Sequence, residues 1–317
     1  MAAGPAAEVS GWLTPGALHT VRAGAHVLTV APAAGGRMAA LTTTRADGSA
    51  IDWLAPMPAA ALRDGFEARA WPKAGSYPLL PYSNRIRDGR FRWQGREVQL
   101  PPHPGQPHAM HGFGHVRPWQ VVESQENAIT LALQHPPGTD WPWAVLARQS
   151  LVLDEAGLAA ALDIRNVGDT PMPVGGGFHP FFARPPGLRI QFDAAHVWPA
   201  DGGGVATGRA AIGRREAFLR ERHLPDSDLS VYYSGWKRQA TLRRADGATL
   251  TLRAAEPLEH LILHAPGGCD FVCLEPVSHV ADAVNLRARG WEGTGLRALA
   301  PGESVTFRMQ WLIEVPR

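Results

Sequence analysis

The chain has 317 residues, 45% of them hydrophobic, and a formal net charge of only +2. This composition is sufficient to bury a large core. The basic residues are scattered along the chain, which argues against binding to nucleic acid or to an anionic membrane surface. No segment approaches the ~18 apolar residues that a membrane span needs. The first residues, MAAGPAAEVSGW, lack the pattern of a secretory signal.

The two cysteines, Cys269 and Cys273, lie in the segment GGCDFVCLEP, which is predicted to be a strand. Four residues of strand span roughly 13 Å, which is beyond the ~7 Å limit for Cα atoms joined by a disulfide. Two free thiols are typical of a reducing compartment, so we expect the protein to be cytoplasmic.

Turn-forming residues punctuate the chain, with 34 glycines and 28 prolines, and this favours many short strands over long helices. The best helix candidate, residues 57–69, is short. Apolar runs flank short polar turns and predict hairpins over 121–133, 150–164 and 240–253. Alternation of apolar and polar residues over 304–315 predicts a half-buried final strand. We therefore expect an all-β fold, a large antiparallel β-sandwich in which residues 1–317 form a single domain.

Polar residues among prolines mark the first candidate site segment, SYPLLPYSNRIRDGRF. Asn84 and Arg85 follow an extended stretch there. Amide and guanidinium groups together offer the donors and acceptors that bind sugar hydroxyls. A turn carrying a surface arginine is the alternative interpretation of this segment.

Four histidines mark the second segment, HPGQPHAMHGFGHVRPW: His103, His108, His111 and His115. Clustered histidines raise the possibility of a metal site. Their spacing is irregular, however, and the segment contains no cysteine or carboxylate, whereas metal sites usually show recurring spacings and supporting carboxylates. We therefore predict no metal here and a loop that carries one functional histidine.

The third and fourth segments each carry one residue that stands out from its surroundings. In PVGGGFHPFFARP, three glycines precede His179 and its aromatic neighbours, as in the wall of a pocket, although a buried structural histidine would fit as well. In FVCLEPVSHVADAVN, Glu275 follows an apolar run and precedes a proline. Since a buried glutamate needs a partner or a chemical role, Glu275 is the strongest candidate for function in the chain.

Taken in order, NRIRDGRF, HGFGHVRPW, GGGFHPFF and CLEPVSHVADAVN resemble the motifs of the aldose 1-epimerase (galactose mutarotase) family, in particular its shorter bacterial members. The resemblance implies a supersandwich fold with a cleft on one concave sheet. It implies His179 as general acid, Glu275 as general base and His111 as a second histidine at the sugar. It also implies Arg85 and Asn84 as substrate ligands.

The same resemblance implies an aspartate that binds a sugar hydroxyl. Asp228 is the candidate, with Asp226 as its rival, because the local spacing departs from the family pattern. The activity implied is interconversion of the α and β anomers of a free aldose, with a small sugar as the partner and a monomer or homodimer as the assembly. No G-x-G-x-x-G or P-loop motif occurs, in agreement with a reaction that needs no cofactor.

Two alternatives remain open on the sequence. A hexose-phosphate 1-epimerase would need an arginine cluster for the phosphate, and Arg85 and Arg87 are the candidates for it. A non-catalytic sugar-binding module could share the fold. The presence of both histidines and of the glutamate favours the enzyme, because a lectin needs no acid/base pair.

Overall fold

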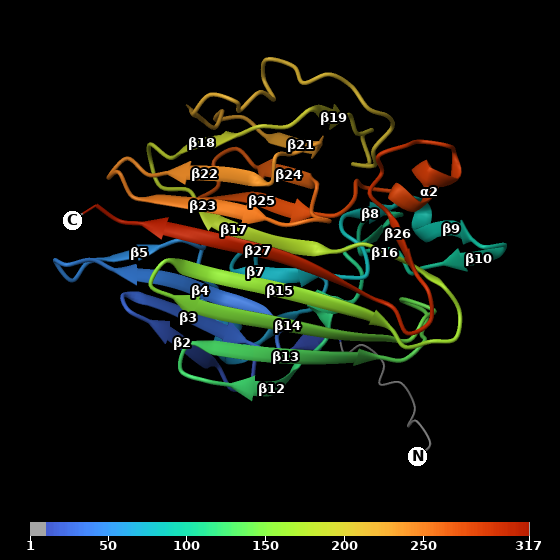
Figure 1. The fold of residues 1–317 in the computed structure, drawn as a ribbon, viewed down its shortest axis with the longest axis horizontal. Coiled ribbons are helices and arrows are strands. Elements are labelled where there is room, and N and C mark those ends of the chain that lie inside the picture. The colour runs from blue at the N-terminus through green and yellow to red at the C-terminus, as the bar shows by residue number, and fades with distance from the viewer. Residues whose placement is uncertain (1–10, 317) are drawn as a thin grey trace.

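The computed structural model describes residues 11–316 as two antiparallel sheets packed face to face, with short strand pairs and helices at the periphery (Figure 1). Most of the amino-terminal segment that lacks a secretory signal lies outside the described residues. Neither α-helix in the described part of the chain is long or apolar enough to cross a membrane.

The first large sheet has ten strands and carries the site described below. Across the sheet its strands are β19 (His196–Trp198), β21 (Leu229–Ser234), β24 (His260–Ala265), β25 (Phe271–Val277), β17 (Gly177–Ala183), β7 (Ser76–Leu79), β4 (Arg37–Thr44), β3 (His26–Ala31) and β2 (His19–Ala23), with β5 (Ala50–Asp52) paired to β4.

The second large sheet has nine strands and includes all three predicted hairpins. Across the sheet its strands are β12 (Gln120–Ser124), β13 (Ala128–His135), β14 (Val145–Asp154), β15 (Gly157–Asn166), β27 (Ser304–Glu314), β23 (Thr249–Ala254), β22 (Gln239–Arg243), β18 (Arg189–Phe192) and β20 (Arg222–His223). The hairpins β12–β13, β14–β15 and β22–β23 confirm the expectations drawn from the apolar periodicity.

The remaining elements are short. Two-stranded pairs are formed by β1 (Trp12–Leu13) with β6 (Phe66–Glu67), β8 (Arg85–Ile86) with β11 (Ala109–Met110), β9 (Arg90–Trp93) with β10 (Arg96–Gln99), and β16 (Met172–Val174) with β26 (Arg297–Leu299). The helices are α1 (Ala59–Asp64) and α2 (Ala283–Ala288), with single 3₁₀ turns at Arg87–Gly89 and Gly114–Val116. The predicted helix 57–69 is therefore reduced to α1, and β6 follows it after one glycine.

The hydrophobic core lies between the two large sheets. On β27 the side chains at alternate positions are buried, including Phe307 and Trp311, as the alternation in sequence predicts. Phe182 of β17 meets Trp311 from the opposite sheet, with ring centroids 5.1 Å apart. Since side chains alternate across a strand, the neighbours of Phe182 on β17 point to the other face of the ten-stranded sheet.

That other face is also covered, because every residue of β25 and all but the last residue of β17 are buried or nearly so. In an antiparallel sandwich the second sheet covers only one face of a strand, so a strand buried on both faces needs other segments of the chain to cover its outer face. Here the cover is provided by loops, namely the one that carries the histidine-rich segment and the one at residues 200–204. Both cysteines are free, as expected, although Cys269 lies in the turn before β25 and only Cys273 is in the strand.

Candidate active site

The covered face of the ten-stranded sheet contains a cavity of about 850 Å³, within the range that small-molecule sites occupy. Four strands of the sheet supply its floor and the loops supply its walls. The polar and aromatic lining residues are Trp71, Lys73, Asn84, Arg85, Gln106, His108, His111, His179, Phe181, Asp201, Ser230, Tyr232, His264 and Glu275. Five of the six predicted site residues are in this set, and they come from segments up to 191 positions apart (Asn84 to Glu275).

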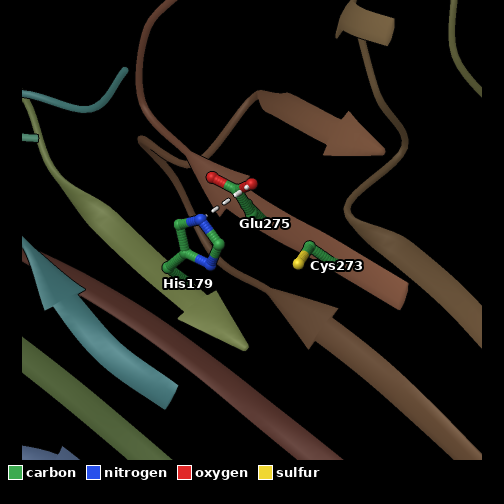
Figure 2. A group of neighbouring side chains, drawn as sticks. All are labelled: His179, Cys273 and Glu275. Carbon is green, nitrogen blue, oxygen red and sulfur yellow. Dashed lines mark ion pairs between the residues drawn. The ribbon is translucent and has the colours of Figure 1, made fainter. Parts of the chain in front are cut away.

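His179 and Glu275 form a buried pair at the floor of the cavity. The Nε2 atom of His179 lies 3.3 Å from the Oε1 atom of Glu275 (Figure 2). The register of β17 and β25 sets this contact, because Phe181 pairs with Cys273 and Gly177 with Val277. Two residues further along each antiparallel strand, His179 faces Glu275. The pair is therefore built into the sheet itself and does not depend on a mobile loop.

Burial controls the protonation of this pair. Burial raises the pKa of Glu275 well above its ordinary value, and the charge of Arg85 only partly opposes the shift. Burial likewise lowers the pKa of His179, with the charge of His111 acting in the same direction. A carboxylate beside an imidazole favours its protonated form, but at His179 desolvation outweighs this effect. Burial therefore disfavours the charged form of both members of the pair.

Each member of the pair has one further polar atom without a partner among residues 11–316. These atoms are Nδ1 of His179 and Oε2 of Glu275. Buried polar atoms are rarely left unpaired in native structures, and exceptions often indicate a functional role. Glu275 lines the cavity, and its Oε2 is an oxygen to which no described residue donates a hydrogen bond.

His111 stands above His179, with ring centroids 5.3 Å apart. The backbone N–H of Asn84 donates to Nδ1 of His111 at 3.1 Å, so the neutral imidazole carries its proton on Nε2. Both residues occupy the left-handed region, with φ of 58° at Asn84 and 60° at His111. Such a conformation at a histidine is unfavourable and is found preferentially at functional sites. The conformation presents His111 as a hydrogen-bond donor.

Arg85 lies in the cavity wall and is held by uncharged partners. Its Nε donates to Oε1 of Gln106 at 2.9 Å, and its Nη1 lies 3.4 Å from Oδ1 of Asn84. The same Asn84 oxygen accepts from the Arg85 backbone N–H at 3.0 Å and from the Tyr232 hydroxyl at 3.3 Å. Asn84 therefore orients the arginine and the tyrosine in addition to lining the cavity.

Asp228 is the predicted site residue that the structure does not bring to the cavity. Its side chain is exposed, and Oδ1 accepts the backbone N–H of Gly267 at 2.7 Å. Asp226, the rival candidate, is also exposed and is not among the lining residues. Both residues lie in the turn before β21, whose later residues Ser230 and Tyr232 do reach the cavity.

Asp201 lies in the cavity wall instead, and the sequence analysis did not select it. Its Oδ2 pairs with Arg87 at 2.5 Å, and its Oδ1 accepts the backbone N–H groups of Gly203 and Val205. The hydroxyl of Tyr232 donates to the Gly204 carbonyl at 2.7 Å and ties down the same loop. An aspartate directly before three glycines was the available signal, since such a segment brings backbone close to a ligand.

Aromatic rings on neighbouring positions of the sheet pack against the histidines. Tyr77 of β7 stacks on His179 with centroids 4.6 Å apart, and Phe181 stacks on the same ring at 4.6 Å. Tyr77 also stacks on His115 at 4.9 Å. His115 is thus a supporting residue that does not line the cavity, whereas His108 and His111 of the same segment do.

Arg37 of β4 lies behind this stack and is completely buried, at 0% exposure. Its guanidinium carbon is 4.5 Å from the centroid of the Tyr77 ring, and none of its three side-chain nitrogens has a partner among the described residues. Burial lowers the pKa of Arg37 to about 10. Desolvating a charge costs several kcal/mol, while stacking on an aromatic ring returns about 2 kcal/mol.

We therefore expect Arg37→Met to leave the free energy of unfolding unchanged or to raise it by about 1 kcal/mol, because methionine fills the volume without a buried charge. Arg37→Ala should lower it by about 2–4 kcal/mol because it leaves a cavity. Denaturant unfolding of both variants beside the wild type provides the measurement. A loss of more than about 2 kcal/mol in Arg37→Met would show instead that the guanidinium stabilises the fold.

A group of possible metal ligands coincides with the acid/base pair. The ligand atoms of His179, Cys273 and Glu275 lie within 4.8 Å of one another (Figure 2). Within the described chain it is this group, and not the four histidines of the second segment, that could hold an ion. The ligand atoms of a tetrahedral zinc, each ~2.0–2.3 Å from the metal, lie roughly 3.3–3.8 Å apart, and His179 and Glu275 already have that spacing at 3.3 Å.

Comparisons with known proteins agree with the motifs and the geometry. The family model described as aldose 1-epimerase matches residues 18–311. The Escherichia coli K12 protein YphB is 31% identical over 265 residues, covering 79% of this chain and 89% of its own length. The crystal structure of a putative aldose 1-epimerase from E. coli K12 superposes with a TM-score of 0.82 at 27% identity, covering 95% of this chain and 99% of that one.

A crystal structure of a galactose mutarotase-like protein from Clostridium acetobutylicum has the same fold, with a TM-score of 0.81 at 20% identity and coverage of 94% and 95%. The family model spans most of the chain, and a relative above 30% identity covers more than two thirds of it. The chain belongs to the aldose 1-epimerase family.

Proposed function

We propose that this protein interconverts the α and β anomers of an aldose by acid/base catalysis of ring opening and closure. The observation that carries the proposal is the buried His179–Glu275 pair, 3.3 Å apart, at the floor of a cavity large enough for a sugar. Membership of the aldose 1-epimerase family supports the same assignment.

Ring opening needs two proton transfers and no redox change. Glu275 removes the proton from the hydroxyl at C1, and His179 delivers a proton to the ring oxygen as the bond between C1 and that oxygen breaks. The product is the open-chain aldehyde. After rotation about the bond between C1 and C2, the transfers run in reverse and the ring closes on the other face of the carbonyl.

The remaining lining residues hold the sugar while C1 moves. The Nε2–H of His111 and the free Nη atoms of Arg85 are donors, and the ring of Phe181 offers an apolar surface to a sugar face. Contacts of this kind keep the reacting atoms close to the acid/base pair. Asp228 is not included among the ligands, because its carboxylate lies outside the cavity.

The burial of the pair fits the number of protons that the reaction needs. One proton must be on the pair, and burial favours the arrangement in which Glu275 carries it and His179 is neutral. Transfer over 3.3 Å from Glu275 to His179 gives the carboxylate and imidazolium that begin ring opening. A substrate hydroxyl that donates to the free oxygen of Glu275 favours this transfer, because hydrogen bonds stabilise the charged carboxylate.

Replacement of the base tests the assignment. We expect Glu275→Gln to lower kcat by about 10²–10⁴-fold, since the amide is nearly isosteric and cannot accept the proton. Polarimetry on freshly dissolved α-D-glucose and α-D-galactose measures the rate. Asp228→Asn, the same carboxylate-to-amide change outside the cavity, should keep the wild-type rate. More than about a tenth of wild-type activity in Glu275→Gln would contradict the role of Glu275.

The pH dependence of kcat/KM tests the pair. In the wild type we expect a bell, because rate is lost when the pair gains a second proton at low pH and when it loses its only proton at high pH. Burial lowers the pKa of His179 and raises that of Glu275, which moves the two limbs away from the ordinary values of the groups. The apparent pKa values of the two limbs therefore belong to the coupled pair and not to either residue alone.

His179→Gln should abolish most of the rate and also remove the alkaline limb. The remaining rate needs only the Glu275 carboxylate, so it should rise with pH through the raised pKa of Glu275 and not fall again. His196→Gln, at an exposed position on β19, should keep the wild-type bell. An alkaline limb that survives in His179→Gln and disappears in His111→Gln would mean that the two histidines have exchanged roles.

Removal of metal tests whether the group of His179, Cys273 and Glu275 acts through its protons. We expect full activity after dialysis against a chelator, because a bound ion would occupy the atoms that must carry the proton. Activity that disappears on dialysis and returns with one divalent ion would contradict the acid/base scheme. Metal analysis of the protein before and after dialysis is the control.

A further inference from the structure

The cavity carries more positive than negative charge. Four of its lining residues belong to the types that are charged at neutral pH: Lys73, Arg85, Asp201 and Glu275. Both acids already have partners. Asp201 pairs with Arg87 at 2.5 Å and accepts two backbone N–H groups. Glu275 lies 3.3 Å from Nε2 of His179 in a buried pair.

The two cations have no such compensation. Arg85 is held by the side-chain oxygens of Gln106 and Asn84, which are uncharged. Lys73 makes no ion pair within the described part of the chain, and its Nζ lies 4.2 Å from the centroid of the Trp71 ring. Stacking on tryptophan fixes the position of an ammonium group but leaves its full charge in place. Lys73 therefore offers a positioned and unneutralised cation to a ligand.

Neighbouring groups extend this positive wall. The charges of Lys73, Arg69 and Arg85 all lower the pKa of His103, after burial, so three cations lie within electrostatic reach of one histidine. His103 meets the edge of the Trp71 ring at 5.5 Å, beside the ring face that Lys73 occupies. The carboxylate of Glu67 is the one negative charge that acts in the opposite direction on the pKa of His103. The sequence analysis found only Arg85 and Arg87 as candidates for an anion, because these residues converge only in the fold.

A neutral sugar has no group that needs the charge of Lys73. An uncharged ligand needs donors and acceptors, which Asn84, Gln106, Ser230 and the histidines supply. A cation that lines a site without a counter-ion raises the local concentration of anions and strengthens each hydrogen bond that it donates to one.

We propose that the sugar on which this enzyme acts carries an anionic group, a carboxylate or a phosphate, and that Lys73 on the Trp71 ring binds that group. The inference rests on the proposed anomerase function and names the substrate class of the same cavity. The charge of Arg85 acts on Glu275, so the anion is assigned to Lys73 and the hydroxyls near C1 to Arg85.

The test compares three sugars in the full-length protein. Anomer exchange of D-glucose, D-glucuronate and D-glucose 6-phosphate is followed by NMR at matched ionic strength, and kcat/KM is determined for each above the uncatalysed rate. We expect at least one of the two anionic sugars to exceed glucose by about tenfold or more, a typical effect of one hydrogen bond to a charged group. Comparison of kcat/KM for D-glucuronate with that for D-glucose 6-phosphate shows whether the site prefers a carboxylate or a phosphate.

Lysine substitution then assigns the effect. Lys73→Gln should reduce the ratio of kcat/KM for the preferred anionic sugar to that for glucose by about tenfold. The chain offers one matched control, because Lys237 is its only other lysine and does not line the cavity. Lys237→Gln should leave the ratio unchanged. The preference should also weaken as salt is raised, since salt screens a partly exposed charge.

Two results would overturn the proposal. Turnover of glucose at a rate equal to or above that of both anionic sugars would leave the anomerase function intact and refute the anionic substrate. A preference for an anionic sugar that Lys73→Gln does not change would refute the role of Lys73. Absence of catalysed exchange with all three sugars would refute the anomerase function, and the substrate assignment would fail with it.

Discussion

The antiparallel pairing of β17 with β25 is the constraint on which the proposed chemistry depends. Side chains two residues apart share a face of a strand, so the register that pairs Phe181 with Cys273 also places His179 opposite Glu275. Because both strands lie in the interior of a ten-stranded sheet, their separation is fixed by backbone hydrogen bonds on both sides. An acid/base pair held in this way keeps its geometry while the bound sugar opens and turns.

Burial gives this pair its chemical character. In water a glutamate and a histidine would each titrate independently, but the covered face of the sheet disfavours charge on both. The cover comes from loops that are themselves tightly fixed. The backbone N–H of His111 donates to the Asn84 carbonyl at 2.9 Å. Both residues have positive φ. Tyr232 ties the Gly204 backbone to the same assembly.

The sequence predicted those features that depend on local order. Alternation of apolar residues revealed β27, and short polar turns revealed the three hairpins of the nine-stranded sheet. A glutamate within an apolar run identified Glu275 as buried, which the structure confirms at 2% exposure. Features that depend on contacts between distant segments could not be predicted. Lys73 looks like an ordinary loop residue in the sequence, and Arg37 gives no sign of being buried. Asp228 was selected from the family resemblance, whereas its carboxylate accepts the Gly267 backbone N–H and does not line the cavity.

The central claim is that this site moves protons on a sugar and does not merely bind one. The most direct measurement is magnetisation transfer between the α and β anomer signals of a sugar already at anomeric equilibrium, with enzyme present at far below the sugar concentration. The account predicts an exchange rate that rises in proportion to enzyme concentration while the anomer ratio stays constant, because a catalyst accelerates both directions equally. Binding of the sugar, seen as line broadening or in a calorimeter, without any increase in exchange would contradict it.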